Sequence, residues 1–315
     1  KEGLTVFRDQ QFTSDMHNYA IKRIEDIKFL RNTQFREDSG PTSHPVKPEK
    51  YLEIDNFYTT TIYEKGAEII RMAQTIISEE KFKKGFSSFI NKYDGEAATI
   101  DNFIETIFEE HKYIKIEKFK IWYKQNGTPL LTFKRYWDKN RKTLKIFISQ
   151  NNNKDNPINK LPLIIPINLA VFTDQHNFKE IKFILDKKND QITLKNISTD
   201  LEKPITSYMR ELSAPVKWET DLNLEEELFI LENEKDYFSI YNSASRIYEF
   251  IISERLKGNP LLDFEDKFIN VLKSLLISNN FNLSLLAEIL NIPSFLEIES
   301  YSNFIDPQNI YKVLD

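Results

Sequence analysis

Histidines are the side chains that most readily bind a metal or exchange a proton at neutral pH. This chain has four of them, His17, His44, His111 and His176. No two are four residues apart, so no pair can share one helix face as a two-histidine zinc site on a helix requires. The chain has no cysteine, which excludes disulfides and thiolate metal sites. We expect His44, which stands in a proline-rich loop, to be structural.

Glu2 and Asp9 are acidic residues whose spacing could place two carboxylates on one face of a helix. They are seven residues apart, which is two helical turns. Because lone glutamates are common on protein surfaces, the residue type alone favours an exposed acid at Glu2. For Asp9, a surface ion pair with Arg8 or Lys22 weighs as much as a role at a site.

Tyr63 could act as a hydrogen-bond donor, because a tyrosine hydroxyl stays protonated at neutral pH. A donor of this kind can stabilise a negative charge that develops only in the transition state of a reaction. However, Ile70 and Ile77 follow Tyr63 at heptad spacing, which is typical of a tyrosine packed in a helical core. The spacing alone favours the core interpretation.

A helical region over residues 1–126 is predicted to carry these side chains. Its clearest apolar stripe consists of Ile62, Gly66, Ile69, Ala73 and Ile76. Small polar residues that favour helix starts predict caps at Ser14, Ser78 and Thr99. Three prolines within the loop 38–48 exclude a regular helix there.

At Gly127-Thr128-Pro129 the hydrophobic period changes from helical to alternating. Leu144, Ile146 and Ile148 alternate with Lys145, Phe147 and Ser149, which predicts a strand. Further strands are expected within 163–172, 181–185 and 192–197, with an Asn-rich loop at 151–157 and a last strand or exit at 213–216. This pattern predicts a small β-sandwich over residues 127–219. A helical pattern then returns over residues 220–315, so the fold class is α+β.

Charge and hydropathy exclude several kinds of partner. The chain has 43 basic and 48 acidic residues, a formal net charge of −5, so no positive excess recruits nucleic acid or an anionic membrane. No apolar run reaches the roughly 18 residues of a membrane-helix candidate, and no signal peptide is visible. We expect a monomer in the cytoplasm, with no nucleic-acid or membrane partner.

Seven short segments together resemble consecutive parts of the aminopeptidase N family of zinc metallopeptidases, of the bacterial alanyl type. They are KEGLTVFRDQ at 1–10, SHP at 43–45, NFY at 56–58, YEKGAE at 63–68, WY at 122–123, GTP at 127–129 and SAPVK at 213–217. The first and the tyrosine-containing segments are specific in combination, whereas GTP or WY alone would be weak. The resemblance implies that residues 1–126 are the C-terminal helical part of a thermolysin-like catalytic domain. Residues 127–219 would be its β-sandwich and residues 220–315 the beginning of an all-helical C-terminal domain.

The resemblance also implies roles for individual residues. Glu2 would be one of three protein ligands of Zn²⁺ and would also contact the substrate, beside two histidines and a water. Tyr63 would stabilise the tetrahedral transition state. Asp9 would orient a zinc-bound imidazole from behind. Tyr58 would line the pocket for the first side chain of the substrate, with simple core packing as the alternative.

Two parts of the family pattern are missing from this sequence. The His-Glu-x-x-His helix is absent, and with it both histidine ligands and the catalytic glutamate, and the Gly-x-Met-Glu-Asn strand is absent too. Asp55 stands where the pattern often has Asn, and its role is left open. We expect a fragment, cut through the active site, of an enzyme that removes N-terminal residues from peptides. Alone it should be inactive and carry little zinc. The alternatives are a non-catalytic binding or scaffold module of the same architecture, or simply an autonomously folded α+β fragment.

Overall fold

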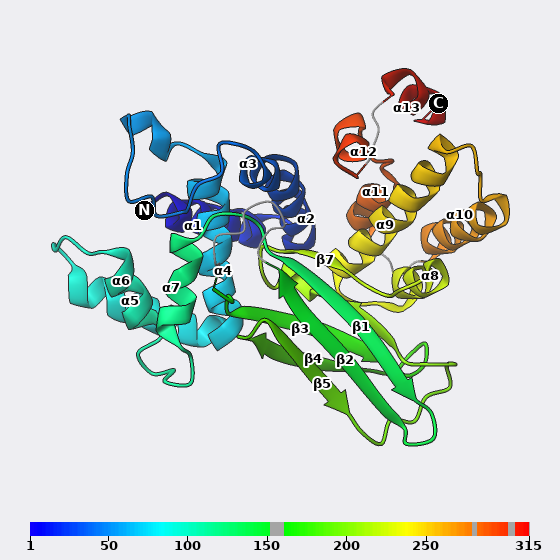
Figure 1. The fold of residues 1–315 in the computed structure, drawn as a ribbon, viewed down its shortest axis with the longest axis horizontal. Helices are drawn as coiled ribbons and strands as arrows, with labels where there is room; N and C mark the ends of the chain where they lie inside the picture. The colour runs from blue at the N-terminus through cyan, green and yellow to red at the C-terminus, as the bar shows by residue number, and fades with distance from the viewer. Residues whose placement is uncertain (152–160, 279–281, 302–305, 315) are drawn as a thin grey trace.

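The computed structural model describes residues 1–315 except 152–160, 279–281, 302–305 and 315. The chain forms a helical region, a β-sandwich and a second helical region, in that order (Figure 1). This order confirms the predicted fold class. The Asn-rich loop predicted at 151–157 lies, beyond Asn151, outside the described residues.

The first helical region contains seven α-helices joined by irregular turns. The α-helices are α1 (Glu2–Met16), α2 (Tyr19–Phe29), α3 (Phe35–Ser39), α4 (Gly66–Ile77), α5 (Glu79–Tyr93), α6 (Ile100–Ile107) and α7 (Ile116–Lys124). Two π-helical turns, η1 (Leu30–Gln34) and η3 (Thr61–Lys65), and the 3₁₀ turn η2 (Ile54–Phe57) lie between them. The two π-helical turns run directly into α3 and α4, and they contact each other.

Helix starts in this region test the predicted caps. Thr99 caps α6 as predicted, in a reciprocal pair of hydrogen bonds with Asn102. Ser78 precedes α5, but its side chain makes no capping hydrogen bond. The prediction for Ser14 is wrong, because its hydroxyl donates to the carbonyl oxygen of Gln10 (2.8 Å) inside α1. Asn18 is the cap of α2 instead, since its side chain accepts two backbone N–H bonds.

The sandwich consists of a four-stranded and a three-stranded sheet. The strands are β1 (Leu130–Asp138), β2 (Thr143–Asn151), β3 (Ile165–Phe172), β4 (Phe178–Leu185), β5 (Asn189–Leu194), β6 (Ile205–Tyr208) and β7 (Lys217–Glu219). The strand orders are β5-β2-β1-β7 and β4-β3-β6. Leu144, Ile146 and Ile148 all point into the core, whereas Phe147 is 45% exposed. The predicted alternation of β2 is therefore confirmed.

The central strand β3 is buried along nearly its whole length rather than on alternate residues. It pairs with β4 and β6 on its two edges, and the helix α4 contacts it. Burial on both faces explains its continuous apolar sequence. The segment 213–216 is an exit rather than a strand, and it leads into β7, which pairs in parallel with β1.

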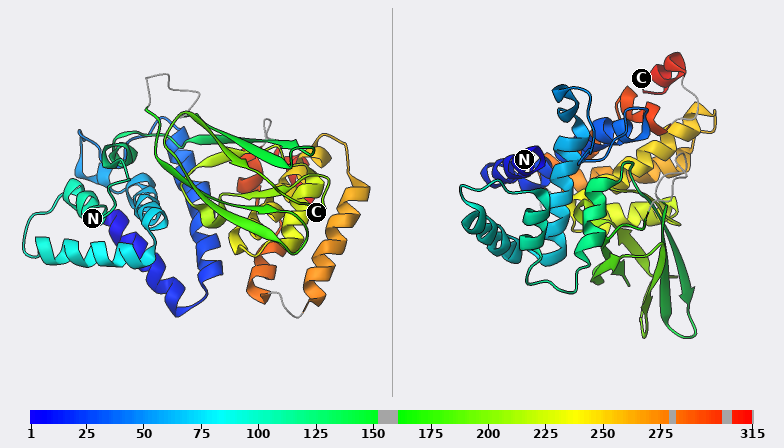
Figure 2. Two further views of the ribbon diagram at one scale, coloured as in Figure 1. Left: turned by 90° about the horizontal axis from the view of Figure 1, so that it is seen from below. Right: turned by 60° about the vertical axis from the view of Figure 1, so that its left-hand side comes forward.

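The second helical region packs against the first. Its helices are α8 (Leu224–Asn233), α9 (Tyr237–Leu256), α10 (Leu262–Ile277), α11 (Leu283–Leu290), α12 (Phe295–Tyr301) and α13 (Pro307–Leu314). Ile24 and Ile27 of α2 share one hydrophobic cluster with Ala244 and Ile247 of α9. Figures 1 and 2 show the two helical regions meeting above the sandwich.

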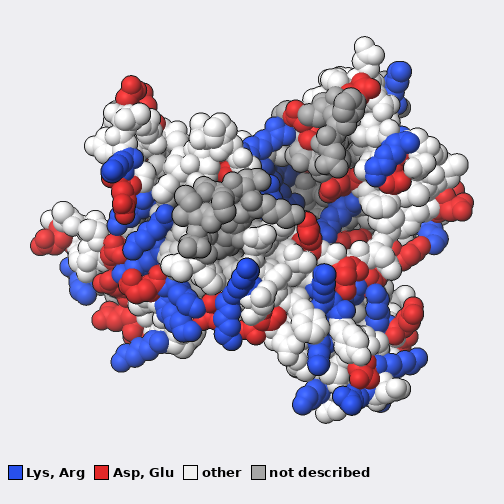
Figure 3. Space-filling view, viewed as in Figure 1, with Lys and Arg blue, Asp and Glu red and all other residues white. Residues whose placement is uncertain are grey.

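Two surface properties bear on the expected partners. Among the described residues no helix is both long enough and apolar enough to cross a membrane. On the described surface seen in Figure 3, basic and acidic side chains are interspersed rather than gathered by sign.

Candidate active site

A close crossing of α1 and α4 brings together two segments that are some sixty residues apart in the chain. A Cβ atom on Gly3 would lie 2.6 Å from the carbonyl carbon of Gly66, and one on Gly66 would lie 3.2 Å from the Cα of Gly3. Only glycine lets two helix backbones approach this closely. Glu2 precedes Gly3, and Tyr63 lies one turn before Gly66. The crossing therefore places the turns that carry these two candidates in contact.

Glu2 is the first residue of α1 and lies partly open to solvent. Its side chain is 27% exposed, and its nearest described cation is the Nζ of Lys1, 3.7 Å away. The start of a helix favours a negative charge. The carboxylate of Glu2 is therefore accessible to a metal ion or to a ligand from solvent.

Tyr63 is half-buried in η3, and Tyr58 lies beside it. The two ring centroids are 6.3 Å apart, and Tyr58 is 69% exposed, which is contrary to the core-packing interpretation of that residue. Within the described part of the chain, no residue hydrogen-bonds the hydroxyl of Tyr63, so this donor is available to a ligand. Asp55, in the neighbouring 3₁₀ turn η2, is exposed to solvent.

Asp9 is exposed on α1, two turns after Glu2. In the described ranges it forms no ion pair with Arg8, which donates to Gln11, or with Lys22, which pairs with Asp26 at 2.7 Å. The surface ion pair weighed for Asp9 is therefore not formed, and its role at a site stays a prediction.

A chain of buried and partly buried polar contacts holds α1 and α2 against η3 and α4. Arg71 Nη2 donates to Gln10 Oε1 (2.6 Å), and Gln10 Nε2 donates to Glu64 Oε2 (3.3 Å). Arg23 binds Glu68 through two bonds of 2.6 and 2.8 Å. Burial alone would raise the pKa of the Glu68 carboxyl, but Arg23 and Arg71 hold it below its usual value.

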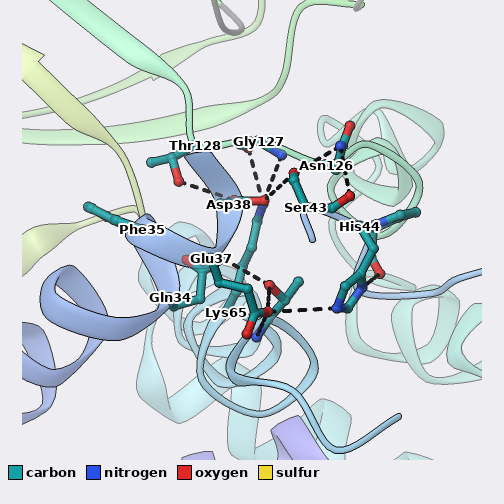
Figure 4. A network of polar contacts seen from close by, with 12 residues as sticks. Gln34, Phe35, Glu37, Asp38, Ser43, His44, Lys65, Asn126, Gly127 and Thr128 are labelled. Carbon is teal, nitrogen blue, oxygen red and sulfur yellow. Dashed lines mark hydrogen bonds and ion pairs between the residues drawn. The ribbon is translucent and has the colours of Figure 1, made fainter. Parts of the chain in front are cut away.

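The same region is tied to the first residues of the sandwich. Lys65 Nζ lies 2.7 Å from Asp38 Oδ2 and donates to the carbonyl oxygen of Gly127 at 3.1 Å (Figure 4). Asp38 also accepts the N–H of Gly127 (2.8 Å) and the hydroxyls of Ser43 and Thr128. Burial would raise the pKa of Asp38, but the Lys65 ammonium, the N–H of Gly127 and the side chain of Gln34 lower it.

His44 lies at this junction, and its structural role stays a prediction. Its Nε2 lies 3.7 Å from Oε1 of Glu37 (Figure 4). Its Nδ1 contacts the carbonyl oxygen of Pro45 at 2.9 Å. Sequence reasoning missed Glu37 and Asp38. No local pattern in the sequence marked them. In the structure, the segments SHP, YEKGAE and GTP, which carry the family resemblance, meet at these two acids.

The residues present fit part of a zinc site. Glu2 offers one accessible carboxylate, a suitable zinc ligand. Among the described residues, no group of three or more histidines, aspartates or glutamates is arranged to hold a metal ion. The described residues thus supply at most one ligand of a mixed set.

A cleft of about 660 Å³ lies elsewhere, between α2–α3, β7 and the helices α9, α11 and α12. Its lining contains neither Glu2 nor Tyr58 nor Tyr63. Arg36 and Phe35 of α3 line it, whereas the neighbouring Asp38 is turned to the junction with Gly127. The cleft is therefore distinct from the candidate site.

Comparison with known proteins identifies the class. Residues 1–123 match the peptidase family M1 domain, residues 127–221 a domain of unknown function with an Ig-like fold, and residues 224–315 a domain of unknown function with ARM repeats. The chain belongs to the M1 peptidase family, in its aminopeptidase N group.

Its curated relatives include aminopeptidase N of Haemophilus influenzae, 34% identical over 98% of this chain and 37% of that protein. Aminopeptidase N of Escherichia coli is 32% identical over 99% of this chain and 37% of that protein. The crystal structure of Legionella pneumophila aminopeptidase A in complex with aspartic acid superposes with a TM-score of 0.84, at 23% identity, covering 99% of this chain and 34% of that one. This likeness shows the fold. The chain spans little more than a third of the length of these relatives.

Proposed function

We propose that the protein to which this chain belongs is a zinc aminopeptidase that removes N-terminal residues from peptides with a free N-terminus. The observation that carries the proposal is the crossing at Gly3 and Gly66, which juxtaposes the turns of Glu2 and Tyr63. The similarity to aminopeptidase N supports it. We further propose that the protein acts as a cytoplasmic monomer and that its domains here are 1–126, 127–219 and 220–315.

Each candidate residue then has a distinct task. Glu2 supplies one zinc ligand, with histidines from outside this chain completing the set, and also contacts the substrate. Bound zinc would lower the pKa of a water molecule and polarise the scissile carbonyl. Tyr63 donates a hydrogen bond from its hydroxyl to the oxyanion that develops during water attack. Tyr58 presents an exposed ring to the first side chain of the substrate, and Asp9 orients an imidazole.

The test uses the full-length protein with its histidine pair. Glu2→Ala should lose zinc and activity together, because a carboxylate ligand is removed. Tyr63→Phe should retain zinc and folding and lose about a hundred- to a thousandfold in kcat, as removal of one oxyanion donor does. Elemental analysis and steady-state kinetics on an alanyl or leucyl chromogenic substrate measure both. Normal kcat in Tyr63→Phe would contradict the assigned role.

The alternative is a binding or scaffold module of the same architecture that has no metal chemistry. One observation distinguishes this module from the enzyme, namely whether the coding sequence upstream of Glu2 contains a His-Glu-x-x-His motif. If this motif were absent, the module interpretation would replace the enzyme.

A further inference from the structure

Tyr63 lies in the middle of the π-helical turn η3, and two successive carboxylates of α3 hold the two ends of that turn. Figure 4 shows both carboxylates, with Asp38 beside Lys65. Glu37 binds the N-terminal end at Thr61, and Asp38 binds the C-terminal end at Lys65. We call Glu37 and Asp38 the α3 acid pair. Single π-helical turns are rare and are frequently found at functional sites.

The C-terminal end of the turn is held by an ion pair that is almost fully buried. The side chain of Lys65 is 1% exposed and that of Asp38 is 0% exposed. A buried charge that loses its partner is strongly unfavourable, so the Lys65 ammonium is confined to its position beside Asp38. Because Lys65 is two residues after Tyr63, this pair determines where the backbone of the turn runs.

The N-terminal end is held by a carboxylate that does the work of a helix cap. Thr60 precedes η3, and its side chain makes no capping bond to the turn. Glu37 instead accepts the backbone N–H of Thr61 (3.0 Å), the hydroxyl of Thr60 (2.8 Å) and the hydroxyl of Thr61. Burial would raise the pKa of Glu37, but these donors lower it, so the carboxylate is ionised at neutral pH.

The hydroxyl of Tyr63 itself has no hydrogen-bond partner within the described ranges, so nothing holds the phenol at its tip. Its direction depends on the backbone of η3 and on ring contacts such as that with Tyr58. We propose that the α3 acid pair are positioning residues that aim the hydroxyl of Tyr63 at the reacting carbonyl. This inference rests on the proposed function of Tyr63.

Neither acid needs to touch the substrate. A displacement of about 1 Å in a positioned group can cost about a hundredfold in rate. Loosening the turn should therefore lower kcat and leave KM nearly unchanged, because the phenol bonds the transition state more strongly than the bound substrate.

The main variant removes the buried pair as a unit, because Asp38→Asn with Lys65→Met leaves no unpaired charge. In the full-length zinc enzyme we expect kcat to fall about ten- to a hundredfold, with KM and zinc content nearly unchanged. The matched control is Arg135→Met with Glu226→Gln, an ion pair of 2.7 Å between β1 and α8 whose side chains are 2% and 7% exposed. It should retain normal kcat. Equal losses in the two double variants would overturn the inference.

Glu37→Gln is a second variant that keeps the shape of the side chain and removes its charge. It should also lower kcat, and its effect should vanish when Tyr63→Phe is already present, because there is then no hydroxyl to aim. Full additivity of the two substitutions would overturn the inference. If Tyr63→Phe alone left kcat normal, the proposed function of Tyr63 would fail instead, so the two failures are distinguishable.

Hydrogen exchange gives a measurement that does not depend on activity. The amide of Thr61 should exchange faster in Glu37→Gln, because a neutral amide holds its N–H more weakly than a carboxylate does. Exchange in α6 should stay unchanged as an internal reference. An unchanged rate at Thr61 would show that Glu37 does not hold the turn, and would overturn its part of the proposal even if the double variant failed to fold.

Discussion

The α1–α4 crossing and the interior of the β-sandwich are both buried, but they are built from opposite kinds of residue. At the crossing two glycine backbones touch, and beside it the buried charges of Arg23 on α2 and Glu68 on α4 are fully paired. In the sandwich, branched apolar residues such as Ile146 and Ile148 fill the core. Apolar packing tolerates small shifts, whereas hydrogen-bonded charge and backbone contact admit one geometry. The candidate site lies at the crossing, where the contacts fix the positions of the groups more strictly than apolar packing does.

The largest effect should come from breaking a buried charge pair at the crossing. Arg23→Met removes the bidentate partner of buried Glu68 and leaves Arg71 (3.2 Å) as its remaining cation, which should cost about 3 kcal/mol of unfolding free energy, the lower end for a broken buried pair. Ile146→Val in the sandwich, which removes one methylene, should cost about 0.5–1.5 kcal/mol. Urea unfolding of both variants measures the difference. Similar losses would erase the contrast between the two regions.

Gly3→Ala tests the backbone contact. The added methyl would lie 2.6 Å from Gly66, so the helices must separate, at about 1–3 kcal/mol by analogy with overpacked cores. Gly85→Ala is the matched control, because its Cβ would lie 3.2 Å from Ile107, and the gain in helix propensity offsets the tighter fit. Thermal unfolding should show a clear loss for the first variant and little change for the second.

Acid should weaken the junction through Asp38. Its pKa is lower in the folded protein than the ordinary value of 3.8, so its contribution is present above about pH 4 and is lost as pH falls through the folded pKa. The stability difference between wild type and Asp38→Asn should therefore shrink between pH 7 and pH 3. Asp26 and Glu64 have raised pKa values, so their contribution to stability changes with pH in the opposite direction. The comparison of wild type with Asp38→Asn cancels their contribution, because both proteins contain these two residues. A gap that widened on acidification would contradict this sign.

The smallest effect concerns the start of α2. Asn18→Ala removes a side chain that accepts two backbone N–H bonds and should cost about 1 kcal/mol. Ser14→Ala, at the position predicted as the cap, should change stability by less than about 0.5 kcal/mol. Circular dichroism melting curves of the two variants compare them directly. A larger loss for Ser14→Ala would restore the sequence-based assignment.

Helix and strand segments were predictable because their signals are local. The repeat of Ile69, Ala73 and Ile76 indicates α4, and the alternation of Leu144, Ile146 and Ile148 indicates β2. Ser14 misled because a serine inside a helix can bond the carbonyl one turn back, and sequence alone does not distinguish this from a cap. Glu2 and Tyr63 were found by family resemblance, and their roles stay predictions.

The sequence by itself determined the succession of helical, strand and helical regions, because hydrophobic period depends only on near neighbours. Only the tertiary structure decided that Gly3 meets Gly66, that Lys65 is buried against Asp38, and that Gly127, just before the first strand of the sandwich, joins them. Lysines and aspartates are ordinarily exposed, so nothing local distinguishes this pair from its many solvated counterparts. Their burial follows from contacts between segments far apart in the chain, and those contacts exist only once the chain has folded.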